Sequence, residues 1–470
     1  MANPIKLVVI GAGPGGYAAA FLAADLGMDV TMIEKEPNPG GICLYRGCIP
    51  SKAYLHVAKI ISEAKHAKNF GIEYAAPKMD INKLREWKKG IVSKLTSGLG
   101  QLAKARKIRY LQGEAFFTSS TTVKFRRADG VVEDVTFDKA ILATGSRPTT
   151  LPFAPKSPHI WDSTSALEME AVPESLLVVG GGYIGMELGT VYHELGSKVS
   201  VVEMLGGLLP GADPDLADVL AKRVKGMFEA IMLETRVLKF EETSNGIAVT
   251  FADKQGKEFT KEYNKVLISI GRRPNYENLG LDNTQVVVTP RGFVEVNDQR
   301  RTHDANIYAI GDIAGDPMLA HKASHEGRVA VEAIAGHKVA FEPKAIPAVV
   351  FTDPEIAWCG ITEGEAAKAG KEIRVIKFPW GASGRALTLD RQDGLTKLII
   401  EPGTERILGV GIVGVGAGEM ISEGVLAIEM GSVANDLKLT IHPHPTLSET
   451  IMETAESFFG HSTHIYKPKR

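Results

Sequence analysis

A strand, a glycine-rich loop, a helix and a second strand that ends in an acidic residue open this chain, and this order constrains its fold most strongly. The apolar run Lys6–Ile10 leads into three glycines at fixed spacing, Gly11, Gly13 and Gly16. The next apolar run, residues 29–33, ends in Glu34. Such glycines allow a tight turn and a close approach of the backbone to a diphosphate. The helix N-terminus then offers amide donors to phosphate oxygens, and Glu34 is placed to accept hydrogen bonds from ribose hydroxyls.

The same order returns in the middle of the chain. Residues 176–179 lead into Gly180, Gly182 and Gly185, and the run Lys198–Val202 ends in Glu203. The first glycine and the acid are 23 residues apart in both copies, 11 to 34 and 180 to 203. A single glycine pattern is a weak signal, but its recurrence with strands, helix and acid is a strong one. The sequence therefore predicts an α/β protein with two Rossmann-like dinucleotide-binding domains.

Two further segments help to delimit this duplication. Gly409, Gly411 and Gly414 share the glycine spacing, but Ser432 stands where the acid would be, so we predict a closely packed strand and turn there. Residues 141–148 resemble residues 267–274. Each of these segments predicts a buried parallel strand that leaves its nucleotide fold through a glycine, Gly145 or Gly271.

Two cysteines follow the first copy. Cys43 and Cys48 are two of only three cysteines in the chain. On a regular helix, residues five apart have α-carbons roughly 8.5 Å apart, whereas a disulfide needs about 4.4–6.8 Å. Either Cys43 precedes a helix or the first helical turn is distorted, which Gly41 and Gly47 would permit. We interpret the pair as a redox-active dithiol, and Cys359 as a buried core thiol.

Composition narrows the class of protein. A chain of 470 residues exceeds one hydrophobic core and predicts about three or four domains. Its net charge of −2 gives no reason to expect nucleic acid or a membrane surface. No run reaches about 18 apolar residues, so we expect no membrane span. Because a strand begins already at residue 5, we expect no signal peptide and a cytoplasmic location. A zinc site needs four ligands, and no second Cys/His pair lies near the cysteines, so we expect no metal.

Three segments together resemble the pyridine nucleotide–disulfide oxidoreductases. They are the dithiol segment 40–52, the flavin-type segment 308–312 and the segment 442–449. The resemblance extends from Ile5 to about Phe459 and implies FAD in the first nucleotide fold and NAD in the second. It also implies a central segment that completes the FAD site and a C-terminal α+β dimerisation domain. The implied domains are residues 1–149, 150–275, 276–345 and 346–470.

The resemblance implies a reaction and its partners. The reaction is the FAD-dependent oxidation of protein-bound dihydrolipoamide with reduction of NAD. The enzyme would be a homodimer that serves the lipoyl domains of 2-oxoacid dehydrogenase or glycine-cleavage complexes. Glu34 and Glu203 disfavour a 2′-phosphate, so NAD is preferred over NADP at the second site.

The resemblance also assigns cofactor contacts. Asp312 would hold the FAD ribitol, and Lys52 would lie near the flavin, paired with Glu187. Tyr183 resembles a movable aromatic residue that covers the flavin until nicotinamide displaces it. The residues assigned to FAD are Gly11, Gly13, Gly16, Glu34, Lys52, Ala115, Gly145, Asp312 and Ala320. Those assigned to NAD are Gly180, Gly182, Tyr183, Ile184, Gly185, Glu187, Glu203, Val237 and Gly271.

Four residues are expected to carry the chemistry. Cys48 resembles the thiol next to the flavin, and Cys43 resembles the thiol that exchanges with the substrate. Exchange needs a thiolate, and His444 is the expected acid–base, reaching the dithiol of the opposite subunit. Glu449 would orient the His444 ring, as carboxylates do in catalytic triads. Residues 446–449 also fit a capping box, in which Glu449 would only cap a helix.

The dithiol segment departs from the usual family pattern at three positions. Ile42 replaces a small hydroxyl residue, and Tyr45 and Arg46 replace an amide and a small aliphatic residue. We expect these changes to affect the flavin environment or the substrate mouth.

Two alternatives to this function are another flavin disulfide reductase of the family and a non-enzymatic nucleotide-binding subunit. Glu203 and the tail 466–470, which has no cysteine, disfavour reductases of the glutathione, mercuric and larger thioredoxin types. The presence of both cysteines and of the His–Glu pair argues against the non-enzymatic subunit.

Overall fold

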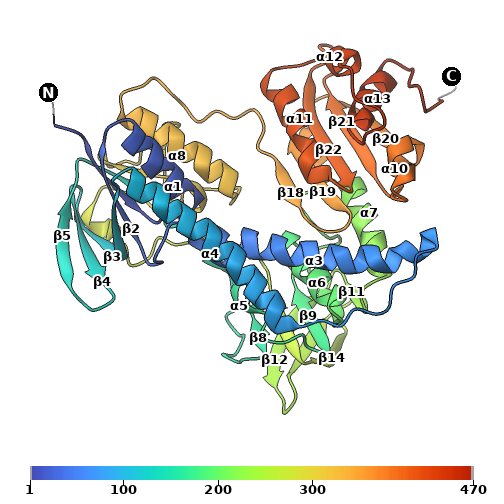
Figure 1. Cartoon of the computed structure of the whole chain (residues 1–470), viewed down its shortest axis with the longest axis horizontal. Coiled ribbons are helices and arrows are strands. Elements are labelled where there is room, and N and C mark those ends of the chain that lie inside the picture. Colours follow the sequence, from blue (N-terminus) through green and yellow to red (C-terminus); the bar gives the residue numbers. More distant parts are fainter. Residues whose placement is uncertain (1–2, 467–470) are drawn as a thin grey trace.

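The computed structural model describes residues 3–466 as three sheet-containing units around the long helices α3 (Cys48–His66) and α4 (Ile81–Ala105) (Figure 1). The first unit contains the N-terminal strand, the second lies below α3 in this view, and the third lies above α3. Within residues 3–466, no helix is long and apolar enough to cross a membrane. Residues 1–2 and 467–470 lie outside the described part of the chain, and with them most of the cysteine-free tail considered above.

The first unit is built on a seven-stranded sheet. In spatial order its strands are β17 (Ile307–Ala309), β6 (Lys139–Leu142), β1 (Lys6–Ile10), β2 (Asp29–Glu34), β3 (Arg109–Ser119), β4 (Thr122–Arg127) and β5 (Val132–Thr136). The strands from β17 to β3 are parallel, and β3, β4 and β5 pair in antiparallel fashion. Helices α1 (Pro14–Asp25) and α8 (Ala320–Ile334) pack together against this sheet. Because β17 and α8 belong to this unit, a segment from beyond the second glycine loop completes the first nucleotide fold.

The second unit repeats the parallel arrangement. Its five strands, in spatial order, are β11 (Ala230–Met232), β10 (Lys198–Val202), β9 (Ser175–Val179), β15 (Lys265–Ile268) and β8 (Ile160–Trp161). Its helices are α5 (Ser163–Glu168), α6 (Tyr183–Glu194) and α7 (Pro214–Lys225). An antiparallel sheet of β12 (Arg236–Glu242), β13 (Ile247–Ala252) and β14 (Glu258–Tyr263) packs on one side. The short strands β7 (Ser146–Pro148) and β16 (Arg272–Pro274) pair with each other and join the exits of the two nucleotide folds.

The C-terminal unit is an antiparallel sheet with helices. Its strands, in spatial order, are β18 (Ala348–Val350), β19 (Glu355–Gly360), β22 (Ile407–Gly414), β21 (Leu395–Ile400) and β20 (Arg374–Pro379). Its helices are α9 (Glu363–Lys368), α10 (Gly384–Thr388), α11 (Ala417–Glu429), α12 (Ala434–Leu439) and α13 (Glu449–Phe458). Val350, Ile356 and Val413 of this sheet join the same hydrophobic cluster as α3 and the second unit. One core thus connects the helix of the dithiol segment with the other two units.

The two glycine loops have the same geometry. Gly11 donates its N–H to Ile33 at 2.8 Å, and Gly180 donates its N–H to Val202 at 2.9 Å. A Cβ atom at Gly16 would lie 2.0 Å from the carbonyl oxygen of Gly11, and one at Gly185 would lie 2.2 Å from that of Gly180. The third glycine of each loop is therefore required for close helix–strand packing.

Several expectations from the sequence are confirmed. The third glycine pattern is the internal strand β22, whose neighbours are β19 and β21. Residues 141–148 and 267–274, which resemble each other in sequence, contain the ends of the parallel strands β6 and β15. The exit glycines Gly145 and Gly271 have φ values of 67° and 113°, in the region that favours glycine. Cys359 is 2% exposed in β19.

The dithiol segment is divided into two helices. Cys43 lies within α2 (Gly41–Arg46), and Cys48 begins α3. Between them Gly47 has φ −142° and ψ −114°, well outside helical geometry. The distortion that the cysteine spacing requires is therefore a break between two helices, and Cys43 lies within the first of them and not ahead of a helix.

The glycine-loop geometry makes a prediction about stability. Gly185→Ala should lower the thermal unfolding midpoint by several degrees, because overpacking against the Gly180 carbonyl oxygen costs about 1–3 kcal/mol. Gly182→Ala is the matched control, since a Cβ atom there meets no atom within 4 Å. Circular dichroism at one scan rate measures both variants, and equal midpoints would contradict the packing argument.

Candidate active site

One large cavity contains the dithiol. Its volume is about 1130 Å³, and its lining comes from the first glycine loop, α2, the start of α3, the exit of β6 and the turn before α8. Both Cys43 and Cys48 are among its lining residues. All nine residues that the sequence assigns to FAD also line it: Gly11, Gly13, Gly16, Glu34, Lys52, Ala115, Gly145, Asp312 and Ala320. The structure therefore brings the dithiol and the expected flavin contacts into a single space.

The cavity has the features that a dinucleotide requires. A Cβ atom at Gly41 would lie 2.5 Å from the Cα atom of Gly13, so the start of α2 and the glycine loop pack backbone against backbone. Glu34 accepts a hydrogen bond from the Ala12 N–H at 2.7 Å, which fixes its carboxylate beside the loop. A carboxylate has about four acceptor positions, so Glu34 retains capacity for ribose hydroxyls. The residues present thus fit FAD, which would extend from Glu34 and Ala115 at one end to Lys52 and the cysteines at the other.

The turn that carries Asp312 is held by residues that the sequence reasoning missed. Asp312 accepts a hydrogen bond from the Ser146 hydroxyl at 2.5 Å, and Arg272 donates to the same hydroxyl at 2.8 Å. The fully buried Glu326 accepts from the Gly311 N–H at 2.6 Å and pairs with Arg300 and Lys322 at 3.0 Å. Lys322 and Glu326 stand four residues apart on α8, a spacing that could have suggested an ion pair. Their partners Gly311 and Arg300 lie on other segments, and no local pattern indicates those contacts.

The two thiols are electrostatically unequal. A hydrogen bond with the Cys43 thiol, assisted by the Lys52 ammonium, lowers the pKa of Cys48 against the opposing effect of burial. The same hydrogen bond, together with burial, raises the pKa of Cys43. In the dithiol state, with both cysteines free, Cys48 is therefore the thiol that loses its proton first as the pH rises.

Lys52 is fixed by a carboxylate from the second nucleotide unit. Its Nζ atom donates to both oxygens of Glu187, at 2.8 and 3.0 Å. Glu187, which is 3% exposed on α6, also accepts from the N–H of Phe351 in the C-terminal unit at 2.9 Å. The ammonium lies 4.6 Å from the centre of the Phe351 ring. The pair expected from the sequence is present, and it connects all three units beside the dithiol.

The residues assigned to NAD fall into two groups. Tyr183, Ile184 and Glu187 line the cavity, and desolvation by the surrounding cavity wall raises the pKa of Tyr183 to about 12, although 42% of the residue is solvent-accessible. The others do not line it among the described residues: Gly180, Gly182, Gly185, Glu203, Val237 and Gly271. Glu203 accepts from the Gly181 N–H at 2.7 Å, which repeats the contact of Glu34 in the first copy. Val237 lies on β12, in the antiparallel sheet of the second unit.

His444 and Glu449 form a pair that does not line this cavity in the same chain. The Nδ1 atom of His444 lies 2.9 Å from Glu449 Oε1, and the His444 side chain is 73% exposed. Glu449 also accepts from the Thr446 N–H at 2.7 Å, which is half of a capping box. Burial opposes ionisation, but the hydrogen bonds from Thr446 and His444 hold the pKa of Glu449 below its usual range. The two readings of Glu449 are therefore compatible, because one oxygen contacts the ring and the other contacts the helix start.

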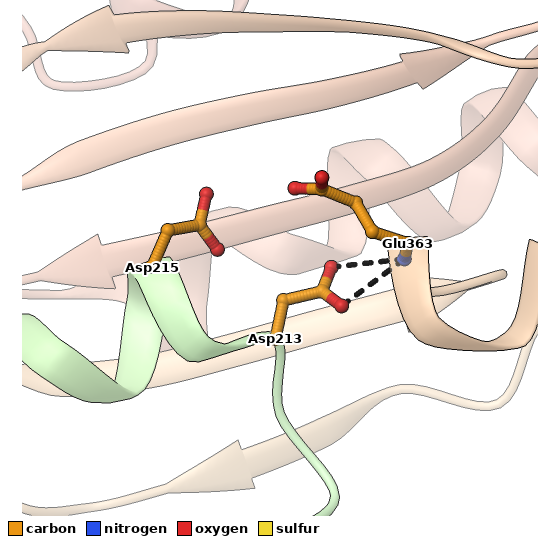
Figure 2. A group of neighbouring side chains, drawn as sticks. All are labelled: Asp213, Asp215 and Glu363. Atoms are coloured by element: carbon orange, nitrogen blue, oxygen red, sulfur yellow. Dashed lines mark hydrogen bonds between the residues drawn. The ribbon is translucent and has the colours of Figure 1, made fainter. Parts of the chain in front are cut away.

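A cluster of carboxylates lies elsewhere, between the second and third units. Figure 2 shows Asp213, Asp215 and Glu363 facing one another, with the Asp213 carboxylate accepting from the Glu363 N–H. The buried Lys397 donates to all three carboxylates at 2.6, 2.8 and 2.9 Å. Burial alone would lower the pKa of Lys397, but these hydrogen bonds hold it above its ordinary value. The cluster is thus an ion-pair network in which a lysine ammonium holds α7 against the C-terminal sheet.

Comparison with known proteins identifies the family. The sequence matches pyridine nucleotide-disulphide oxidoreductases over residues 5–327 and the dimerisation domain of that family over residues 346–455. The chain belongs to the pyridine nucleotide-disulphide oxidoreductase family. Its mixed α/β fold with a C-terminal dimerisation domain is the architecture expected from the sequence.

Individual relatives cover almost the whole chain. Dihydrolipoyl dehydrogenase of Haemophilus influenzae is 49% identical over 472 residues, with 100% of this chain and 98% of the relative covered. The enzyme of the same name from Geobacillus stearothermophilus is 46% identical, with 98% and 97% covered. Among solved structures, LpdA from Mycobacterium tuberculosis has a TM-score of 0.89 at 27% identity, with 97% and 99% covered. The HOCl-induced flavoprotein disulfide reductase RclA from Escherichia coli has a TM-score of 0.85 at 26% identity, with 96% and 99% covered.

The unequal thiols lead to a prediction about pH. Lys52→Met should raise the pKa of Cys48, because it removes a nearby positive charge and leaves the Glu187 carboxylate unpaired. The thiolate of the reduced protein would then form only at higher pH than in the wild type. A pH titration of thiolate absorbance measures the midpoint. Lys59→Met, on the same helix and paired with Glu63, is the matched control. A wild-type midpoint in Lys52→Met would contradict the role of the ammonium.

Proposed function

We propose that this chain is an FAD-dependent enzyme that oxidises protein-bound dihydrolipoamide to lipoamide and reduces NAD. The observation that carries the proposal is the shared lining of one cavity by Cys43, Cys48 and all nine residues assigned to FAD. Relatives that are 44–49% identical over 98–100% of the chain carry the name dihydrolipoyl dehydrogenase. FAD, when bound, supplies a two-electron carrier between the thiols and NAD.

The electrostatics of the thiols support different roles for the two cysteines. In the oxidised enzyme a Cys43–Cys48 disulfide receives the substrate dithiol. A substrate thiolate attacks the Cys43 sulfur, the disulfide breaks, and Cys48 leaves as a thiolate. The lowered pKa of Cys48 favours that direction, because a thiol of lower pKa leaves faster. The second substrate thiol then attacks the mixed disulfide at the substrate sulfur, which releases lipoamide and leaves Cys43 reduced.

His444 is proposed to take the protons of the substrate thiols. The His444 side chain is 73% exposed, and its Nδ1 atom contacts the Glu449 carboxylate, so that a proton on Nδ1 leaves Nε2 as the acceptor nitrogen. His444 does not line the dithiol cavity of its own chain. In a homodimer formed through the dimerisation domain, the partner subunit's His444 would complete each site.

The second glycine loop is proposed to hold NAD. Glu203, tied to the Gly181 N–H, repeats the position of Glu34 and would accept ribose hydroxyls. Tyr183 lines the cavity beside Glu187 and is 42% exposed, a position suited to a side chain that gives way to nicotinamide.

The proposal also covers the domain boundaries, the substrate carrier and the compartment of the enzyme. We infer the four domains 1–149, 150–275, 276–345 and 346–470, a lipoyl domain as the substrate carrier, and a reducing compartment such as the cytoplasm. The principal alternative is another flavin disulfide reductase, as RclA is named. A non-enzymatic subunit would have no need for the unequal thiols.

A direct assay tests the reaction. We expect the purified holoenzyme to reduce NAD with dihydrolipoamide and, at higher efficiency, with a reduced lipoyl domain. We expect no comparable turnover of glutathione disulfide with NADPH. The formation or loss of reduced pyridine nucleotide at 340 nm measures both reactions. Turnover with the second pair alone would overturn the proposal.

A subunit-mixing experiment tests the position of His444. Cys43→Ser and His444→Gln should each lower turnover by about 10²-fold or more while FAD stays bound. A heterodimer of the two variants should recover about half of the wild-type activity, because one of its two sites has both residues intact. If His444 acted within its own chain, neither site would be intact and the heterodimer would stay inactive.

A further inference from the structure

Arg46 is a charged residue of the dithiol segment that the reaction above does not use. It ends α2, two residues before Cys48, and its side chain is about one-third exposed. Arg46 nevertheless lines the cavity, together with Glu34 and Glu36. Its presence there places a guanidinium in the wall of the flavin site.

Glu36 fixes the position of this guanidinium. The Nη2 atom of Arg46 lies 2.5 Å from Glu36 Oε1. Glu36 in turn donates its N–H to Glu34 Oε1 at 3.3 Å, and Glu34 accepts from the Ala12 N–H at the glycine loop. The Glu36 carbonyl accepts from the Tyr110 hydroxyl at 2.9 Å. Arg46 is thus linked, through Glu36 and Glu34, to the first glycine loop.

The positive charge of Arg46 offsets negative charge in this part of the cavity. Glu34 and Glu36 bring two carboxylates to a region where a diphosphate would bind, and both repel it. A guanidinium neutralises Glu36 through one nitrogen and still has further N–H donors for phosphate oxygens. Gly41, at the other end of α2, packs against Gly13 of the loop, and Gly13, Gly41 and Arg46 all line the same cavity.

We propose that Arg46 is an FAD-positioning residue that contacts the ribose–diphosphate part of the cofactor while Glu36 holds its guanidinium. The inference rests on FAD being the flavin of the proposed function. It concerns the retention of FAD, not the exchange of thiols. It also gives a role to one of the three positions at which the dithiol segment departs from the family pattern.

The release of FAD from the holoenzyme tests the proposal. Flavin fluorescence after dilution into buffer measures the release rate. Arg46→Met should release FAD about tenfold faster or more, because a hydrogen bond to a charged group is lost. Arg46→Lys keeps the positive charge but loses the planar guanidinium with its several N–H donors. Its FAD release rate should fall between those of Arg46→Met and the wild type. Arg127→Met removes an arginine that is paired with Asp129 outside the cavity lining, and it should match the wild type.

Glu36→Gln distinguishes a contact between Arg46 and FAD from a purely structural ion pair between Arg46 and Glu36. If Arg46 contacts FAD, Arg46→Met must have a clearly larger effect than Glu36→Gln. Equal effects of the two variants, with no further increase in the double variant, would mean that only their mutual bond matters and would overturn the proposal. A wild-type release rate in Arg46→Met would overturn it as well. A purified wild-type protein without FAD would instead overturn the proposed function itself.

Discussion

The ion pair between Lys52 and Glu187 is the contact on which the arrangement of the site depends. Lys52 lies one turn into the helix that begins with Cys48, and Glu187 lies on the helix that follows the second glycine loop. Glu187 is nearly inaccessible and also accepts the N–H of Phe351. A carboxylate buried to this extent is stable only when it is paired and hydrogen-bonded. The pair therefore fixes three units relative to one another and places a positive charge beside the thiols.

That positive charge contributes to the asymmetry of the dithiol. The hydrogen bond between the thiols and the nearby ammonium together favour the thiolate at Cys48 over that at Cys43. This difference supports the proposed roles of Cys43 as the attacked sulfur and Cys48 as the leaving group. The helix break at Gly47 contributes as well, because it brings the two thiols near enough for each to shift the other's pKa.

The two nucleotide folds position their acidic residues, Glu34 and Glu203, with the same kind of hydrogen bond. Glu34 contacts the Ala12 N–H and Glu203 contacts the Gly181 N–H, both at 2.7 Å. Each carboxylate is thus oriented by its own glycine loop before any ligand binds, which lowers the ordering cost of binding. The first copy differs in that the dithiol segment, with Arg46 and Glu36, is added to the wall of its cavity. Among residues 3–466, no histidine lines the cavity of the thiols, and the exposed His444–Glu449 pair is proposed to supply a base to a second copy.

The local elements and the residue types of the site follow from the sequence. Glycine spacing, apolar runs and the acids 23 residues downstream predicted both parallel folds, because these features depend on turn geometry and on short, continuously buried strands that are close in sequence. The family resemblance then assigned nine FAD contacts that line one cavity. Only the tertiary structure decided how distant groups meet: that Glu326 and Arg300 hold the turn of Asp312, that Gly47 breaks the dithiol helix, that Glu449 serves the ring and the helix start together, and that Lys397 fills the carboxylate cluster. The contacts of Glu326 and Lys397 join segments 15 to 184 residues apart. The Gly47 break and the two Glu449 contacts are local, but they depend on backbone geometry and burial, which a linear pattern does not contain.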